Sequence, residues 1–152
     1  QSGVVDAAEW VGPWNDQAMG LHQAAKYYYY PGWQEPGSAL EALVNASAWE
    51  QLPEDLKAIV HYACLAVTTD MQSDFEANNG AKLHSLVNEH NVQLRAFPDD
   101  VLAELKRHTF AILDELAEQD EMARETWHSF RDFMEQVREA SDTGVRYYLN
   151  HR

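Results

Sequence analysis

A stripe of hydrophobic residues at helical spacing runs through the middle of the chain and most constrains its fold. Apolar residues that recur every three to four positions form one face of an α-helix, and a proline just before them suits a first helical turn. Pro53 stands at that place. The stripe consists of Leu56, Ile59, Val60, Ala63, Val67, Met71 and Phe75, and it resumes after Gly80 with Leu83, Leu86 and Val87. We therefore expect a long helix with a kink or joint at Gly80.

The strand signals are short and lie mostly in the first part of the chain. Residues 3–12 are typical of an extended segment closed by a Gly-Pro turn, and residues 27–30 are a tyrosine run of high strand propensity that ends at a Pro-Gly turn. Residues 40–44 are a third candidate. Residues 92–97 alternate between apolar and polar side chains and are the fourth.

Further helices are expected on both sides of the long one. One spans residues 15–25, and another follows Pro98, because the next two residues are acidic and complement a helix dipole. Residues 121–140 repeat the helical spacing. Ser47 and Glu50 have the spacing of a capping box, in which the side chain of a serine caps the start of a helix.

This balance of elements is unusual for a complete domain, since isolated short strands need hydrogen-bonding partners. The simplest account is that the chain is part of a larger α/β protein whose other strands precede Gln1. We expect residues 1–152 to form a single fragment of α+β class that is predominantly α-helical. Residues 1–50 would be a strand-rich segment on the ligand side, and residues 51–152 would be long helices with one short strand.

Composition excludes some classes of partner. The chain of 152 residues has a formal net charge of -14, with 11 Lys and Arg in total and no basic cluster, which argues against nucleic-acid binding. Cys64 lies among apolar residues at helical spacing and is expected to pack as a small hydrophobic side chain. No stretch approaches the roughly 20 apolar residues of a membrane span, and residues 1–20 lack the basic and apolar regions of a secretion signal.

The motifs of enzymes and metal centres are absent or isolated. Glu125 and His128 have the Glu-x-x-His spacing of di-iron bundles, but that site needs a second copy, which the sequence lacks. The histidines lack the spacing of zinc ligands. There is no Gly-x-Ser-x-Gly elbow and no glycine-rich phosphate loop. A metal-dependent hydrolase is therefore the least supported class.

A cluster of aromatic and acidic residues is the remaining candidate site. Glu9-Trp10 lies near the end of the first extended segment, and Trp33 and Glu35 lie in a loop between two Pro-Gly turns. Composition alone favours an ordinary sheet core with its carboxylates turned to water. Alternatively, a carboxylate walled by aromatic rings loses its solvation and must be protonated, pair with a cation or bind a metal. Two carboxylates and backbone carbonyls form the oxygen shell that Na⁺ or Ca²⁺ prefers.

Longer motifs surround these residues. They are Glu9-Trp-Val-Gly-Pro-Trp-Asn-Asp16, Met19-Gly-Leu21, Lys26-Tyr-Tyr-Tyr-Tyr-Pro-Gly-Trp-Gln-Glu-Pro-Gly37, Val44-Asn45 and Trp49-Glu-Gln-Leu-Pro53. Together they resemble the C-terminal part of the periplasmic solute-binding proteins of TRAP (tripartite ATP-independent periplasmic) transporters, the dicarboxylate-type P subunit family. The resemblance is strongest to a branch similar to α-keto-acid and lactate binders.

The resemblance implies a non-catalytic protein with two α/β lobes, type II-like, that close on a small organic acid. It implies that Na⁺ or Ca²⁺ bridges the protein and the ligand carboxylate. By this resemblance Glu9 and Glu35 each give a side-chain oxygen to the cation and Trp10 gives a main-chain carbonyl, while Trp10 and Trp33 contact the substrate. The ligand-gripping arginine of the family lies in the first lobe, and Arg95 does not match it.

The implied function is periplasmic capture of a small 2-oxo or 2-hydroxy carboxylic acid together with a cation, for delivery to a TRAP membrane permease. The final helix carries Trp127, Phe130 and Phe133. Similar proteins can form homodimers by exchanging a C-terminal helix, which would bury these rings, and packing within one chain is the alternative. A non-catalytic helical interaction or dimerisation module is the rival function.

Overall fold

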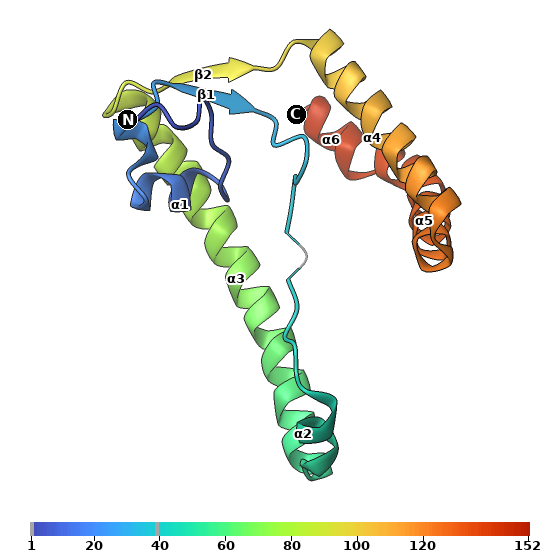
Figure 1. Ribbon diagram of the computed structural model, residues 1–152. Helices are drawn as coiled ribbons and strands as arrows, with labels where there is room; N and C mark the ends of the chain where they lie inside the picture. Colours follow the sequence, from blue (N-terminus) through green and yellow to red (C-terminus); the bar gives the residue numbers. More distant parts are fainter. Residues whose placement is uncertain (1, 39) are drawn as a thin grey trace. The chain divides into compact units, whose positions relative to one another are not determined.

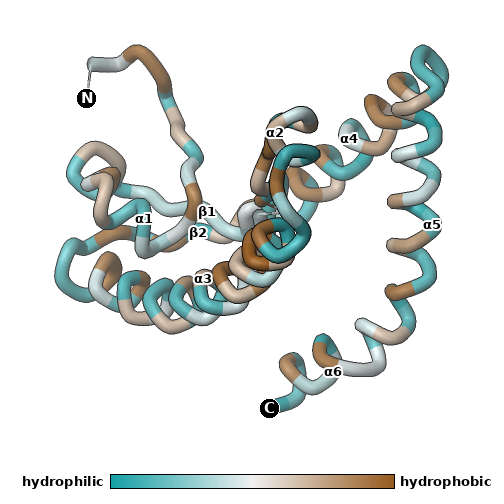
Figure 2. Tube along the Cα trace, turned by 90° about the horizontal axis from the view of Figure 1, so that it is seen from below, coloured by the Kyte–Doolittle hydropathy of each residue, from teal (hydrophilic) through white to brown (hydrophobic). Residues whose placement is uncertain are grey.

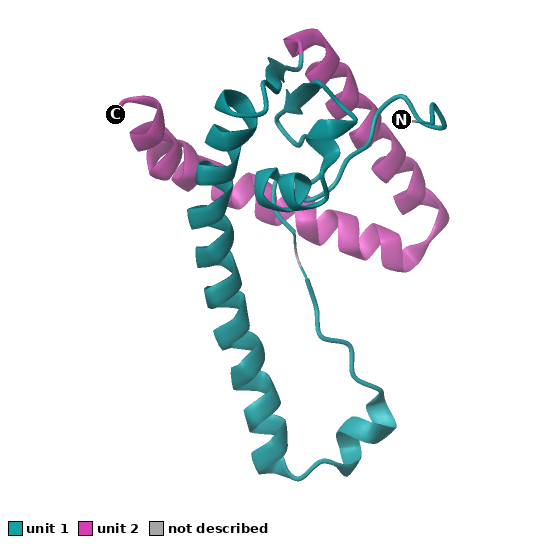
Figure 3. Cartoon of the chain, turned by 90° about the vertical axis from the view of Figure 1, so that its left-hand side faces the viewer, with its two compact units in different colours: residues 1–97 teal, residues 98–152 magenta. Residues whose placement is uncertain are grey.

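The computed structural model describes residues 2–38 and 40–152, and it is mostly helical (Figure 1). Two compact units divide the chain, Gln1–Phe97 and Pro98–Arg152 (Figure 3). The elements of the first unit are α1 (Pro13–Ala18), the 3-10 helix η1 (Leu21–Gln23), β1 (Tyr27–Tyr30), α2 (Ala46–Gln51), α3 (Glu54–Asn88) and β2 (Gln93–Ala96). Those of the second are α4 (Asp99–Gln119), α5 (Glu121–Thr143) and α6 (Val145–Asn150).

Two of the four expected strands form, and they pair with each other. β1 and β2 are parallel, in a register that sets Tyr27 opposite Gln93 and Tyr30 opposite Ala96. The connection between them runs through α2 and α3, as a parallel pair requires a long crossover (Figure 1). Both strands therefore present their carboxyl ends at the same edge.

The long helix α3 is continuous for 35 residues, and the joint expected at Gly80 is absent. Helix α1 contacts α3 on both sides of Gly80. The Trp14 N–H donates to Asn79 Oδ1 at 3.1 Å, and Gln17 Nε2 donates to Ser85 Oγ at 3.0 Å. The Trp14 ring also meets the Phe75 ring edge-on, with centroids 5.3 Å apart. These contacts lie on both sides of the glycine and support the continuous helix there.

The first half of α3 has hydrophobic side chains that the rest of the described chain does not cover. Figure 2 shows hydrophobic positions recurring along this helix between hydrophilic ones. The exposed ones include Leu56, Ile59, Tyr62, Leu65 and Val67. Cys64 is also exposed, so the expectation that it packs as a buried hydrophobic residue is wrong for this chain. Among the described residues, the buried hydrophobic side chains of the first unit are Leu86 and Val92.

The second unit is built around an α-helical hairpin. Asp120 accepts a hydrogen bond from the Ala123 N–H at 2.7 Å and so caps the start of α5. Trp127 on α5 is 6% exposed and meets Phe110 of α4 edge-on, with ring centroids 5.3 Å apart. Its indole N–H donates to Asp114 Oδ1 at 2.8 Å. The ring of Trp127 is therefore packed, and its N–H is hydrogen-bonded, within the hairpin.

Several local expectations differ from the structure. Residues 3–12 and 40–44 form no strand. Among the described residues of the segment 1–50, the strand residues are those of β1. The side chain that caps α2 belongs to Asn45, which accepts from the Ala48 N–H at 3.1 Å, and not to Ser47. The compact units divide after Phe97. Among the helices described, none combines the length and apolar character of a membrane span.

Candidate functional site

The segment that carries Glu9 and Trp10 lies just before α1. Gly12 follows it with a φ of 156°, a backbone conformation that residues with a side chain rarely adopt, and then Pro13 begins the helix. A Cβ at Gly12 would also approach the Asn79 side chain at 3.5 Å. The Gly-Pro pair thus turns the chain tightly onto α3. Glu9 and Trp10 themselves are exposed, Trp10 by 51%.

The segment that carries Trp33 and Glu35 leaves the carboxyl end of β1. It begins with a cis peptide bond between Tyr30 and Pro31. Glu35 is exposed and its Oε1 accepts a hydrogen bond from the Ser38 hydroxyl at 2.9 Å. Trp33 is 41% exposed. In parallel sheets, ligands bind beyond the carboxyl ends of the strands, and Glu35 lies on that side of β1.

The enclosing aromatic environment expected around the two carboxylates does not form within this chain. All four of the proposed site residues are exposed, so the described residues leave Glu9 and Glu35 open to water. Within residues 2–38 and 40–152, no group of three or more His, Cys, Asp or Glu side chains is placed to hold a metal ion. The donors are nevertheless of the right chemistry, because two carboxylates and the Trp10 carbonyl are the oxygen ligands that Na⁺ and Ca²⁺ prefer.

A buried carboxylate that the sequence reasoning missed links the two segments. Asp16 on α1 is 6% exposed. Its Oδ1 accepts a hydrogen bond from the Gly12 N–H at 3.4 Å, and its Oδ2 accepts a short one from the Tyr28 hydroxyl. Sequence analysis assigned Asp16 to the start of a helix only. The available signal was the position of Asp16 inside the Glu9–Asp16 motif. Without that motif, an acid in the first turn of a helix is expected to face water.

The Tyr28 hydroxyl is held in its protonated form by this arrangement. Burial of the ring raises the pKa of Tyr28 well above its ordinary value of 10.0, and the hydrogen bond to the Asp16 carboxylate and its negative charge raise it further. Tyr28 therefore remains a hydrogen-bond donor to Asp16 throughout the physiological pH range.

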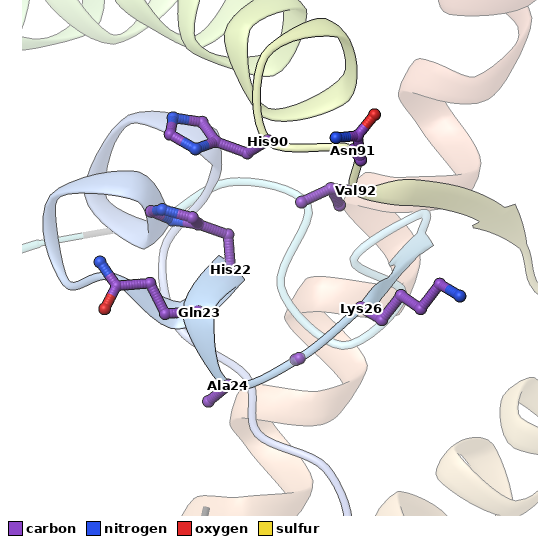
Figure 4. A pocket seen from close by; sticks show the side chains of 8 residues that line it. His22, Gln23, Ala24, Lys26, His90, Asn91 and Val92 are labelled. Carbon is purple, nitrogen blue, oxygen red and sulfur yellow. The ribbon is translucent and has the colours of Figure 1, made fainter.

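A pocket of about 300 Å³ lies at the other end of the strand pair (Figure 4). It is lined by residues that precede β1 and β2, among them Lys26 and Val92. The rings of His22 and His90 lie beside it with centroids 4.3 Å apart. His90 is exposed and packs against a second imidazole. Because the pocket lies at the amino ends of the strands, it is separate from the Glu35 loop.

Arg95 does not take part in the candidate site. Its guanidinium lies 5.2 Å from the centre of the Tyr27 ring and donates to Gln93 Oε1 at 3.0 Å. Tyr27 and Tyr28 point to opposite faces of the strand pair, since side chains alternate along a strand. The arginine is therefore engaged on the face opposite the Asp16 network.

Comparison with known proteins identifies relatives over nearly the whole chain. Residues 1–120 match the family of bacterial extracellular solute-binding proteins, family 7. A monocarboxylate 2-oxoacid-binding periplasmic protein of Nostoc sp. (strain PCC 7120) is 35% identical over 135 residues, which are 89% of this chain and 37% of the relative. The chain thus spans well under half the length of that protein.

Two solved structures of TRAP transporter solute-binding proteins share this fold. One, from Pseudoalteromonas atlantica T6c with bound sodium and pyruvate, is 37% identical with a TM-score of 0.91, over 97% of this chain and 45% of that chain. The other, from Bordetella bronchiseptica RB50, is a mixed-occupancy dimer with calcium and picolinate in one active site. It is 28% identical with a TM-score of 0.94, over 98% of this chain and 44% of that chain.

These matches confirm the resemblance and the α+β, predominantly helical fold class that the motifs indicated. The homologues are solute-binding proteins, and the curated one is periplasmic. On this sequence and structural evidence the chain belongs to the bacterial extracellular solute-binding proteins of family 7 and corresponds to part of a TRAP transporter solute-binding protein.

Proposed function

We propose that this chain is part of a periplasmic TRAP solute-binding protein that captures a small 2-oxo or 2-hydroxy monocarboxylic acid together with Na⁺ or Ca²⁺. The complex is then delivered to a membrane permease, and no covalent bond is made or broken. The observation that carries this proposal is the place of Glu35 beyond the carboxyl end of β1, in a family whose solved members hold a cation and an organic acid.

The chain's own residues supply one side of the site. Glu9 and Glu35 each offer a side-chain oxygen to the cation, and Trp10 offers its main-chain carbonyl. The cation neutralises the two carboxylates and, when bound, attracts the carboxylate of the organic acid. The half-exposed rings of Trp10 and Trp33 provide the apolar surface on which the small acid packs.

The exposure of these four residues fits a site that a second lobe completes. Proteins of this family are longer than this chain, and the resemblance places the arginine that grips the ligand in the first lobe. Ligand and cation contact both lobes only when the lobes are closed, so they shift the population toward the closed form. The permease then recognises that form.

Calorimetric titration of the protein made from its complete coding sequence tests the assignment. Pyruvate and lactate are added with and without Na⁺ or Ca²⁺, and acetate serves as the matched acid without a 2-oxo or 2-hydroxy group. We expect binding of pyruvate or lactate that requires a cation, and much weaker binding of acetate. Absence of heat with all the acids would contradict the substrate class. An affinity that does not change with the cation concentration would contradict the role of the cation.

We also propose that α5 contacts a second copy of the chain. Trp127 is buried within its own hairpin, but Phe130 and Phe133 on the same helix are 59% and 62% exposed. They line a shallow groove with Met122, Glu125, Thr126 and Ser129. A dimer that buries these two rings is supported by the dimeric relative from Bordetella bronchiseptica.

A further inference from the structure

Asp16 is the buried charged residue of the described chain, and its two carboxylate oxygens face two different segments. Oδ1 accepts from the Gly12 N–H at 3.4 Å, while Oδ2 accepts from the Tyr28 hydroxyl. Burying a carboxylate is costly unless its oxygens are hydrogen-bonded. Both oxygens have donors here, the Tyr28 hydroxyl on Oδ2 and a longer contact from the Gly12 N–H on Oδ1.

Each partner of Asp16 belongs to a segment that carries proposed cation ligands. Gly12 ends the turn that directly follows Glu9, Trp10 and Val11. Tyr28 lies in β1, whose carboxyl end leads through Pro31 to Glu35. The carboxylate of Asp16 is thus a bridge between the two segments of the chain that carry these proposed ligands.

The bridge is itself fixed to the scaffold. Helix α1, which carries Asp16, is joined to α3 by the hydrogen bond from the Trp14 N–H to Asn79 Oδ1 at 3.1 Å. The edge-on contact of the Trp14 ring with Phe75 adds a second attachment. Movement of Gly12 or Tyr28 away from Asp16 therefore requires Asp16 to move against the long helix or to release one of its donors.

We propose that Asp16 and Tyr28 are positioning residues that set the affinity and selectivity of the cation site without touching the cation. This inference rests on the proposed function, because it uses Glu9, Trp10 and Glu35 as the ligands. Groups that orient metal ligands typically contribute about 10-fold to 100-fold to metal affinity. Na⁺ and Ca²⁺ differ in the number and charge of the oxygens they prefer, so a change in ligand spacing affects them unequally.

The test compares Tyr28→Phe and Asp16→Asn with the parent, all made as the complete protein. Tyr28→Phe removes the donor and keeps the ring, so the strand pair is retained, and Asp16→Asn keeps the shape and removes the charge. The matched control is Asp114→Asn, which changes the carboxylate that accepts the Trp127 N–H in the second unit. Circular dichroism and thermal unfolding establish that each variant is folded.

Pyruvate affinity is measured across a series of Na⁺ and of Ca²⁺ concentrations, and Tb³⁺ luminescence sensitised by nearby tryptophan reports the cation site without any acid. We expect the half-saturating cation concentration to rise about tenfold or more in both variants, with pyruvate affinity at saturating cation nearly unchanged. Asp114→Asn should match the parent. A general loss of stability would weaken both cation binding and pyruvate binding, and a destabilised Asp114→Asn would show the same change.

The inference is overturned if both variants titrate with cations as the parent does, or if Asp114→Asn shows the same change. A parent that binds Tb³⁺ but none of the acids would refute the substrate assignment, while the Tb³⁺ titrations of the variants still decide the role of Asp16. A parent that binds neither would refute both the proposed function and this inference.

Discussion

At the scale of single residues, the proposed site depends on carboxylates whose surroundings are incomplete in this chain. Glu9 and Glu35 were selected from the sequence because aromatic residues flank them, but both are exposed in the structure. The buried acid is instead Asp16, which was expected only to lie at the start of a helix. Its partner Tyr28 lies twelve positions away along the chain, and only the fold brings the two together.

Neutralising Glu35 tests its role as a cation ligand. Glu35→Gln keeps the size of the side chain and removes the charge, so we expect the cation concentration needed for half-maximal pyruvate binding to rise by about tenfold or more. Calorimetry on the complete protein measures it. Glu41→Gln, an exposed acid in the same connection, is the matched control and should behave as the parent. If Glu35→Gln and Glu41→Gln need the same cation concentration for half-maximal pyruvate binding, Glu35 is not a cation ligand.

The raised pKa of Tyr28 predicts a specific loss of stability in alkaline solution. The folded protein holds this proton more tightly than the unfolded chain, so the contribution is complete below the ordinary pKa of 10.0 and declines as the pH rises above it. Urea unfolding at about pH 9 and about pH 11 should show a larger decline for the parent than for Tyr28→Phe. Tyr29→Phe, which changes an exposed tyrosine of the same strand, should keep the decline of the parent. The same decline in all three proteins would contradict the prediction.

At the scale of elements, the helices followed from the sequence better than the strands did. Helical spacing is a local property, and it located α3, α4 and α5. Strand propensity located β1 and β2, which pair with each other, but residues 3–12 and 40–44 have no strand beside them and remain irregular. The continuity of α3 through Gly80 also escaped local reasoning, because it depends on the packing of α1 across that position.

Helix α2 offers a direct test of which side chain caps it. Asn45→Ala removes the acceptor of the Ala48 N–H and should lower the free energy of opening of this short helix by about 1 kcal/mol. Amide hydrogen exchange in residues 46–51 should then be about fivefold faster. Ser47→Ala, which changes the residue expected from the capping-box spacing, should have little effect. The reverse order of effects would restore Ser47 as the cap.

At the scale of the whole molecule, the exposed hydrophobic surface of the chain fits its partial match to longer relatives. The chain spans 44% and 45% of the two solved structures that share its fold. The uncovered side chains of α3 and the open Glu9 and Glu35 both belong to the first compact unit, and both fit contact with a further lobe. The exposed rings of α5 belong to the other unit, and we propose a second copy of the chain as their partner.

That partner is the second copy proposed above, and a pair of substitutions decides it. Combined Phe130→Ser and Phe133→Ser changes remove the two exposed rings of α5 and leave Trp127 and its bond to Asp114 in place. We expect the parent protein to have the mass of a dimer by light scattering coupled to size-exclusion chromatography, and the double variant to have that of a monomer. The matched control is Val145→Ser, which removes an exposed apolar side chain of α6 and should leave the dimer intact. A monomeric parent, or a double variant that remains dimeric, would show that α5 is not the interface.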